Sequence, residues 1–354
     1  MPGLAENLLT IARLRQDKSA ALANLAEPLR LKIVAPSGSN PGELRMVTYI
    51  PAGLPTGAPL VVVLHGCTQN AAAYDHGAGW STLAERHGFA LLFPEQQRAN
   101  NPNLCFNWFQ PGDVTRGQGE VASIRAMVEQ VLAAHALDRR RVFITGLSAG
   151  AAMTTAMLAT SPDLFAGGAI IAGLPYGAAA SMSEAFSAMG QARRLPARQW
   201  GNLVRAASSH HGPWPAVQIW QGTADTTVNP ANADQLVLQW TDVLGLPPVA
   251  PLQDVVDGAR HEAWPGLDGR PALERWTVPG LAHGTPIATG GTDADRSVGA
   301  PGPHMLAAPI NSTWHLAQSW GLLTQASRPR AANEPAPQAG SLIERTLRSA
   351  GLMQ

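Results

Sequence analysis

Charge is scarce in this sequence, and the two signs cancel. Only 14% of the 354 residues are charged, with 25 Lys and Arg against 25 Asp and Glu. Such a chain has no net field to attract nucleic acid or an anionic membrane surface, so we expect neither partner. A small neutral substrate or a neutral polymer suits this balance better.

Cysteines and long apolar runs are also sparse. Cys67 and Cys105 are too few for a thiolate metal site or a disulfide scaffold, and they form one bridge or none. No apolar run has the length of about 18 residues that a transmembrane helix needs. The first 16 residues have helical periodicity but are interrupted by Glu6, Arg13 and Arg15, so no signal peptide is visible.

What the chain does contain is a regular alternation of apolar segments. Strands are expected at residues 59–64, 89–93, 141–145, 169–171, 217–220 and 273–278. Helical periodicity is expected at residues 80–87, 121–132, 151–160 and 232–244. This alternation predicts an α/β fold with a mostly parallel, doubly wound sheet, preceded by an N-terminal antiparallel hairpin within residues 29–50.

The pentapeptide at residues 146–150, GLSAG, matches the pattern G-x-S-x-G. An ordinary glycine-rich turn gives the same letters, but this one lies between a predicted strand and a predicted helix. That placement favours a nucleophile elbow, the sharp turn that presents a reactive serine in the α/β-hydrolase fold. Side chains at the two glycines would collide with neighbouring backbone. Ser148 is therefore the candidate nucleophile.

A carboxylate and a histidine should follow the serine in that order along the chain. Asp225 comes directly after the strand at 217–220, at the edge where catalytic loops gather, although an Asx-turn is an alternative role for it. Asp234, in the next predicted helix, is the weaker competitor. Asp225 is the candidate acid.

Ten histidines compete for the role of base. His283 follows the predicted strand at 273–278 and is the candidate base. His304, in a Pro/Gly loop, is the alternative. His315 falls within a helix-like segment, and His261 precedes the last strand. We expect the oxyanion of an acyl-transfer intermediate to be bound by two backbone N–H groups, those of Ala149 and Cys67.

Four stretches carry a resemblance to a known family: residues 64–69 (LHGCTQ), 105–109 (CFNWF), 140–150 (RRVFITGLSAG) and 222–228 (GTADTTV). With them the sequence resembles the poly(3-hydroxybutyrate) depolymerase family of esterases, whose relatives include feruloyl and acetylxylan esterases. The resemblance implies an α/β-hydrolase fold, the triad Ser148, Asp225 and His283, and pairing of Cys67 with Cys105. An enzyme of this kind is expected to need no cofactor and no metal.

The resemblance also suggests where substrate binds. Asn107 and Trp108 are expected to line a subsite together with Leu147, although Trp108 is equally a candidate core residue. The sequence departs from the family around His283, where GLAHGTP replaces a G-x-G-H-A-W-like context. It shows no signal peptide and no separate substrate-binding module, so soluble oligomers and small esters are expected substrates alongside polymer.

The expected function is thus a serine esterase acting on short-chain hydroxyalkanoate esters. Alternatives are a carbohydrate esterase for feruloyl or acetyl groups, a non-catalytic binding module on the same scaffold, or terminal helices that act as partner-binding arms. The resemblance and the cysteine pair allow a secreted or periplasmic location.

Three regions are expected along the chain. A helical extension covers residues 1–28, a catalytic domain covers 29–324, and a Pro/Ala-rich linker with a short helix covers 325–354. Within the catalytic domain, residues 174–214 interrupt the strand and helix alternation and are interpreted as a lid insertion.

Overall fold

The computed structural model describes residues 30–324 of the chain. The helix expected at 1–28 and the linker and helix expected at 325–354 lie outside the described residues. The fold described below is therefore that of the central region alone.

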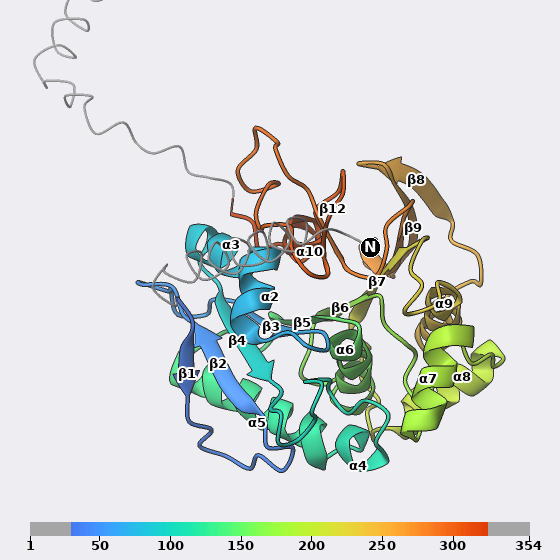
Figure 1. The fold of residues 1–354 in the computed structure, drawn as a ribbon, viewed down its shortest axis with the longest axis horizontal. Coiled ribbons are helices and arrows are strands. Elements are labelled where there is room, and N and C mark those ends of the chain that lie inside the picture. The colour runs from blue at the N-terminus through green and yellow to red at the C-terminus, as the bar shows by residue number, and fades with distance from the viewer. Residues whose placement is uncertain (1–29, 325–354) are drawn as a thin grey trace, which may run out of the picture. The chain divides into compact units, whose positions relative to one another are not determined.

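A ten-stranded sheet forms the centre of this region. Its strand order is β1-β2-β4-β3-β5-β6-β7-β10-β9-β8 (Figure 1). The strands are β1 (Lys32–Val34), β2 (Arg45–Tyr49), β3 (Leu60–Leu64), β4 (Ala90–Glu95), β5 (Val142–Leu147), β6 (Gly167–Ile171), β7 (Ala216–Gly222), β8 (Leu252–Val256), β9 (Ala259–Pro265) and β10 (Pro271–Val278).

The run from β4 through β3, β5, β6 and β7 to β10 is parallel throughout. At one end β1 and β2 form an antiparallel hairpin that pairs with β4, with Lys32 opposite Thr48. At the other end β9 and β8 are antiparallel to β10 and to each other. The predicted mostly parallel sheet with an N-terminal hairpin is confirmed. A separate pair, β11 (Thr285–Ile287) and β12 (Met305–Ala307), is parallel.

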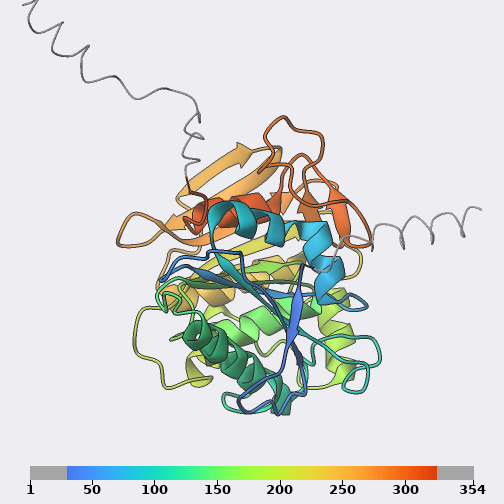
Figure 2. The same cartoon turned by 90° about the vertical axis from the view of Figure 1, so that its left-hand side faces the viewer.

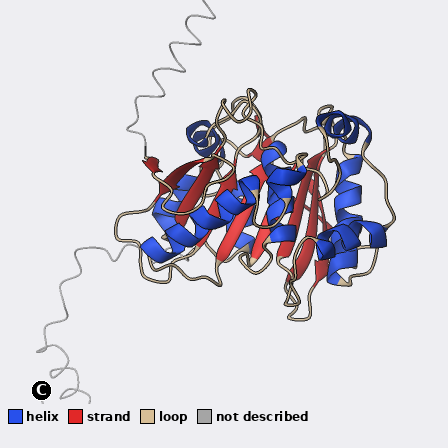
Figure 3. Ribbon diagram, turned by 90° about the horizontal axis from the view of Figure 1, so that it is seen from below, coloured by secondary structure: helices blue, strands red, loops and turns tan. Residues whose placement is uncertain are grey.

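Helices cover both faces of the sheet, as Figures 1, 2 and 3 show. One face carries α5 (Gly119–Ala134), α6 (Ala149–Thr160) and α9 (Ala231–Leu244), and the other carries α3 (Trp80–His87) and α10 (Ser312–Ser319). The remaining helices are α2 (Ala71–Ala78), α4 (Pro111–Val114), α7 (Met182–Gln191) and α8 (Ala197–Ala206). No helix within residues 30–324 is long and apolar enough to cross a membrane.

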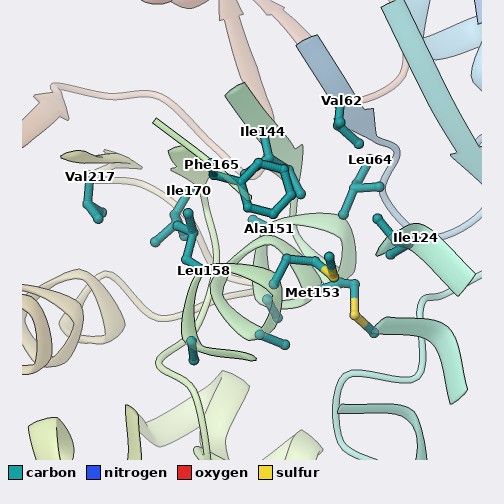
Figure 4. Packing of buried hydrophobic residues seen from close by; sticks show 14 of the residues in the cluster. Val62, Leu64, Ile124, Ile144, Ala151, Met153, Leu158, Phe165, Ile170 and Val217 are labelled. Carbon is teal, nitrogen blue, oxygen red and sulfur yellow. The ribbon is translucent and has the colours of Figure 1, made fainter. Parts of the chain in front are cut away.

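The core explains why the central strands are continuous apolar runs. All five residues of β3 are buried, because helices pack on both of its faces. Val62 and Leu64 meet α6 and α5 in one buried cluster, shown in Figure 4. Phe143 of β5 points to the opposite layer and stacks on Trp320 with ring centroids 4.9 Å apart. Every residue of α6 is buried, so its position is fixed on all sides.

The β8–β9 hairpin was absent from the sequence-based prediction, which placed only a histidine in this stretch. Its turn consists of Asp257 and Gly258, both with positive φ (48° and 77°). Asp-Gly is the sequence preferred by tight hairpin turns that need positive φ at both positions. The sequence therefore contains a turn signal, but the strand at 252–256 is hard to predict because it is mostly exposed and lacks a buried apolar face.

Residues 174–214, interpreted as a lid, contain α7 and α8. Trp200 of α8 is buried, and its Nε1 donates to Gln235 Oε1 of α9 at 3.0 Å. The C-terminal end of α7 is joined to the loop after β7, where the Asn229 N–H donates to the Met189 carbonyl at 2.8 Å. These contacts anchor both helices to α9 and its preceding loop. The lid role stays a prediction.

A column of rings joins the hairpin to the parallel sheet. Trp220, Trp276 and His261 are register neighbours on β7, β10 and β9, and their rings stack in that order. The ring centroids of Trp220 and Trp276 are 4.7 Å apart, and those of Trp276 and His261 are 4.0 Å apart. His261 also bonds two carboxylates, Asp254 through Nδ1 and Glu274 through Nε2, each at 2.9 Å.

His261 gives the stability of the fold a defined pH dependence. Burial acts to lower the pKa of His261, but the hydrogen bonds and charges of Glu274 and Asp254 outweigh it and raise the pKa above its usual 6.5. A pKa raised by folding means that the protonated ring stabilises the native state. This stabilisation is complete below the unfolded pKa of about 6.5 and is lost as the pH rises through the folded value.

His261→Gln is expected to remove this contribution. Urea unfolding of the natural protein should show a free energy of unfolding that falls as the pH rises from about 6 to about 9, and the variant should show a shallower fall. His210→Gln, in the loop before β7, is the control and should keep the natural slope. Equal slopes for the natural protein and His261→Gln would contradict the assignment.

Candidate active site

Three neighbouring parts of the sheet bring the predicted triad residues to one edge. Ser148 follows β5, Asp225 follows β7, and His283 follows β10. β6 lies between β5 and β7, and β10 lies beside β7, all parallel. Because parallel strands end at a common edge, the three loops meet there.

Ser148 lies in a strained turn between β5 and α6. Its backbone has φ 57° and ψ −118°, an unfavourable conformation for a residue with a side chain. A Cβ on Gly150 would overlap the carbonyls of Leu64 and His65 at the end of β3, and one on Gly146 would overlap the backbone of Gly150. Both glycines are therefore steric requirements of the turn, as the pentapeptide indicated.

Asp225 is a buried carboxylate whose two oxygens are both occupied. Oδ1 accepts the backbone N–H groups of Thr227 and Val228, each at 2.9 Å. Oδ2 accepts from Gln221 Nε2 at 3.1 Å and faces His283 Nδ1 at 2.8 Å. Burial acts to raise the pKa of Asp225, but the hydrogen bond and charge of His283, with those backbone donors, outweigh it and hold the pKa below its usual range.

His283 connects the carboxylate to the serine. Its Nε2 lies 2.9 Å from Ser148 Oγ while its Nδ1 bonds Asp225. Since a carboxylate only accepts, Nδ1 carries the proton and Nε2 is left to accept from the serine hydroxyl. The acid and base loops are also joined directly, because the Ala224 N–H donates to the Leu281 carbonyl at 3.0 Å.

The competing residues lie elsewhere or act differently. Asp234 is half exposed and forms an ion pair with Arg275 at 2.8 Å. His315 bonds Asp257 at 3.0 Å, and His261 belongs to the ring column. His304 lies close by, with its ring edge-on to that of His283 at 5.8 Å and its Nδ1 3.3 Å from the His283 carbonyl.

The loop after β3 offers one free backbone donor. The Gly66 N–H donates to Gln69 Oε1 at 2.9 Å, and the Thr68 N–H donates to the Asn103 carbonyl at 2.7 Å. Between them, the Cys67 N–H has no acceptor within residues 30–324. Ala149 opens α6, where the N–H groups of the first turn have no intrahelical acceptor. Both N–H groups chosen from the sequence are thus available to an anion.

Cys67 and Cys105 form a disulfide, as the family resemblance implied. The bridge joins the loop after β3 to the segment that carries Asn107 and Trp108. Asn107 is buried, and its side chain accepts from Asn101 Nδ2 at 2.9 Å.

The three residues predicted to bind substrate are largely enclosed. Trp108 packs in the main cluster, edge-on to Phe109. Leu147 is buried, and its side chain lies beside Gly66. The substrate-binding roles of Asn107, Trp108 and Leu147 stay predictions.

Two polar residues that contribute to the site were not predicted from the sequence. Gln221, at the end of β7, donates a hydrogen bond to Asp225. His65 bonds the Gly66 carbonyl in the loop that also carries the Cys67 N–H. His65 belongs to the LHGCTQ stretch, but nothing in the sequence shows that the side chains of His65 and Gln221 are buried. Within the described residues, no three His, Cys, Asp or Glu side chains are grouped to hold a metal ion.

Comparison with known proteins identifies relatives of this arrangement. A family model described as Esterase PHB depolymerase matches residues 44–253. The chain is 46% identical over 287 residues to poly(3-hydroxyalkanoate) depolymerase C of Paucimonas lemoignei, covering 81% of this chain and 69% of that protein. It is 33% identical over 252 residues to feruloyl esterase B of Thermothelomyces thermophilus, covering 69% of this chain and 84% of that protein.

A solved structure agrees with these relatives. The acetyl xylan esterase from Aspergillus awamori superposes with a TM-score of 0.66 at 28% identity, covering 72% of this chain and 93% of that one. The sheet order and the strand-to-helix turn at Ser148 are those of an α/β-hydrolase. The chain belongs to the esterase PHB depolymerase family and is a carboxylic ester hydrolase. The family and fold expected from the sequence are confirmed.

The disulfide should contribute strongly to stability. It closes a loop with a sequence separation of 38, for which chain-entropy reasoning gives about 4 kcal/mol. The double variant Cys67→Ser with Cys105→Ser is therefore expected to lose about 4 kcal/mol of unfolding free energy in urea titrations. The natural protein unfolded with its bridge reduced provides the matched comparison, and a loss below about 1 kcal/mol would contradict this account.

Proposed function

We propose that this esterase hydrolyses esters of short-chain hydroxyalkanoates by transferring their acyl groups to Ser148. The observation that carries the proposal is the continuous chain Ser148 Oγ to His283 Nε2 at 2.9 Å and His283 Nδ1 to Asp225 Oδ2 at 2.8 Å. It lies at a strained turn beside two free N–H groups. Acyl transfer needs this set: a nucleophile, a base, an orienting carboxylate and donors for an oxyanion.

The reaction follows from these positions. Ser148 Oγ attacks the ester carbonyl carbon as His283 Nε2 takes its proton, and Asp225 stabilises the imidazolium that forms. The tetrahedral oxyanion accepts hydrogen bonds from the backbone N–H groups of Ala149 and Cys67. Collapse breaks the bond to the alcohol, which leaves with the proton from His283. Water, deprotonated by the same nitrogen, then attacks the acyl-serine; the bond from the acyl carbon to Ser148 Oγ breaks, Oγ takes the proton back from His283, and the acid is released.

The substrate class is supported by the relative of highest identity reported above. Poly(3-hydroxyalkanoate) depolymerase C shares 46% of aligned residues, against 33% for feruloyl esterase B. Soluble oligomers and solid polyester are both within this class. A carbohydrate esterase is the second candidate, favoured by the acetyl xylan esterase structure with a TM-score of 0.66.

We also propose that the protein works in an oxidising compartment, secreted or periplasmic. The Cys67–Cys105 bridge supports this location, because such bonds persist outside the reducing cytosol.

Ser148→Ala tests the chemistry. Its turnover of p-nitrophenyl butyrate is expected to fall by about a millionfold, the scale seen for triad serines. The natural protein should be labelled at one serine by a phosphonate ester, and the variant should not. A variant that keeps activity within about tenfold would refute acyl transfer to Ser148 and would favour a binding module on this scaffold.

A matched pair of carboxylates provides the control. Asp225→Asn removes the acceptor that orients His283 and should lower kcat by about ten-thousandfold, because the ring then favours the wrong tautomer. Asp234→Asn makes the same change at the competing aspartate, which is bonded to Arg275, and should leave kcat unchanged. Equal effects of the two variants would argue against Asp225 as the acid.

A substrate panel tests the class of ester. Hydroxybutyrate trimer is expected to give a kcat/KM at least about tenfold above those of methyl ferulate and acetylated xylan, since tenfold corresponds to only about 1.4 kcal/mol of transition-state binding. A film of poly(3-hydroxybutyrate) distinguishes polymer from oligomer activity. Faster release of acetate or ferulate than of hydroxybutyrate would establish the carbohydrate esterase instead.

A further inference from the structure

A buried polar network lies beneath the loop that carries the Cys67 N–H. At its base is Glu120, a fully buried carboxyl group in the first turn of α5. Glu120 Oε1 accepts from Gln96 Nε2 at 2.6 Å, and Oε2 accepts the Asn107 backbone N–H at 2.9 Å. Gln96 connects the carboxyl group to the segments of both cysteines of the disulfide, and Asn107 connects it to the segment of Cys105.

The first branch ends on the peptide group that contains the Cys67 N–H. The backbone N–H of Gln96 donates to His65 Nε2 at 3.1 Å, so the proton of this histidine is on Nδ1. Nδ1 lies 2.8 Å from the Gly66 carbonyl oxygen and donates to it. That carbonyl and the Cys67 N–H belong to the same planar peptide unit and point in opposite directions. Holding the oxygen therefore aims the N–H.

The second branch reaches Cys67 through the disulfide. Gln96 Nε2 donates to the Cys105 carbonyl at 3.0 Å as well as to Glu120. Together with the bond from the Asn107 N–H to Glu120, this fixes the backbone that directly follows Cys105. The Cys67 side chain is covalently tied to that segment. The orientation of the peptide group and the position of the side chain thus depend on one carboxyl group.

Glu120 has no partner that would explain its burial by charge pairing. Within residues 30–324 the side chain of Glu120 accepts hydrogen bonds from amide groups, and the ionisable group that acts on its charge is the carboxyl of Asp113, which has the same sign. Burial raises the pKa of Glu120 to about 8, with Asp113 adding to the effect. A buried acid without a cation costs stability. A role in positioning the active site accounts for its presence.

We propose that Glu120 is a positioning residue that orients the Cys67 N–H toward the oxyanion, acting through Gln96, His65 and the disulfide segment. The proposal rests on the acyl transfer proposed above. Its consequence is specific: loss of Glu120 weakens binding of the transition state and leaves binding of the ground-state ester unchanged, because the oxyanion forms only during reaction.

The test compares Glu120→Ala with Glu120→Gln, using p-nitrophenyl butyrate and counting active sites with a phosphonate. Removing a whole oxyanion donor costs about 100- to 1000-fold in kcat, so a misaimed one should cost about 10- to 100-fold. We expect Glu120→Ala to lower kcat per titrated site by that amount with KM within about twofold. Glu120→Gln keeps one acceptor oxygen and a similar volume, so it preserves only one of the two bonds from Gln96 and Asn107 and should give a kcat between those of Glu120→Ala and the natural protein.

Asp75→Ala is the matched control, because it too removes a buried carboxyl group. Asp75 is also a buried acid whose pKa is raised by burial, but it caps α3 through the Ser81 N–H at 2.8 Å. This variant should lose stability and keep its kcat per titrated site. If Glu120→Ala does not fold, Gln96→Leu replaces it, because it cuts the link between Glu120 and Cys105 and should lower kcat without changing KM.

The outcomes separate this inference from the proposed function. If Ser148→Ala is inactive while Glu120→Ala, or Gln96→Leu in its place, keeps kcat per titrated site within about twofold, the positioning role is wrong and acyl transfer stands. A matched rise in KM with constant kcat would equally overturn the positioning role. Activity in Ser148→Ala would overturn both.

Discussion

The close approach of α6 to the end of β3 is the constraint on which the site depends. Gly150 lies against the Leu64 and His65 carbonyls, where any side chain would overlap them. This contact holds the strained turn at Ser148 and places the start of α6 beside the loop that follows β3. The N–H groups of Ala149 and Cys67 come from these two segments. A single packing contact between a helix and a strand end thus sets the positions of Ser148 and of these two N–H groups together.

The candidate acid and base are held differently, through two loops that are bonded to each other. Asp225 follows β7 and His283 follows its neighbour β10, and the two loops are hydrogen-bonded through Ala224 and Leu281. The strands beneath are held in register by the stack of Trp220 on Trp276. The two loops are therefore held against each other, which keeps Asp225 and His283 within hydrogen-bond distance.

Much of this could be predicted from the sequence because it rests on local patterns. The G-x-S-x-G turn and the apolar strands follow from local sequence, and Asp225 and His283 follow from their places after predicted strands in the chain order that the fold requires. The hairpin β8–β9 was missed because its first strand is exposed and lacks a buried face, although Asp257 and Gly258 mark the turn. The network through Glu120 could not be found, since its residues lie on separate elements and only the folded chain shows that they are buried.

The position of the disulfide has a mechanical consequence. The loop that it closes, from Cys67 to Cys105, contains α2, α3 and β4. Within the sheet, β4 lies between β2 and β3. When the chain is pulled from its two ends, tension passes from Cys67 to Cys105 through the S–S bond, and the residues between them bear no load. The extended length of the oxidised chain is shortened by that loop, and an interior strand of the sheet is shielded from direct traction.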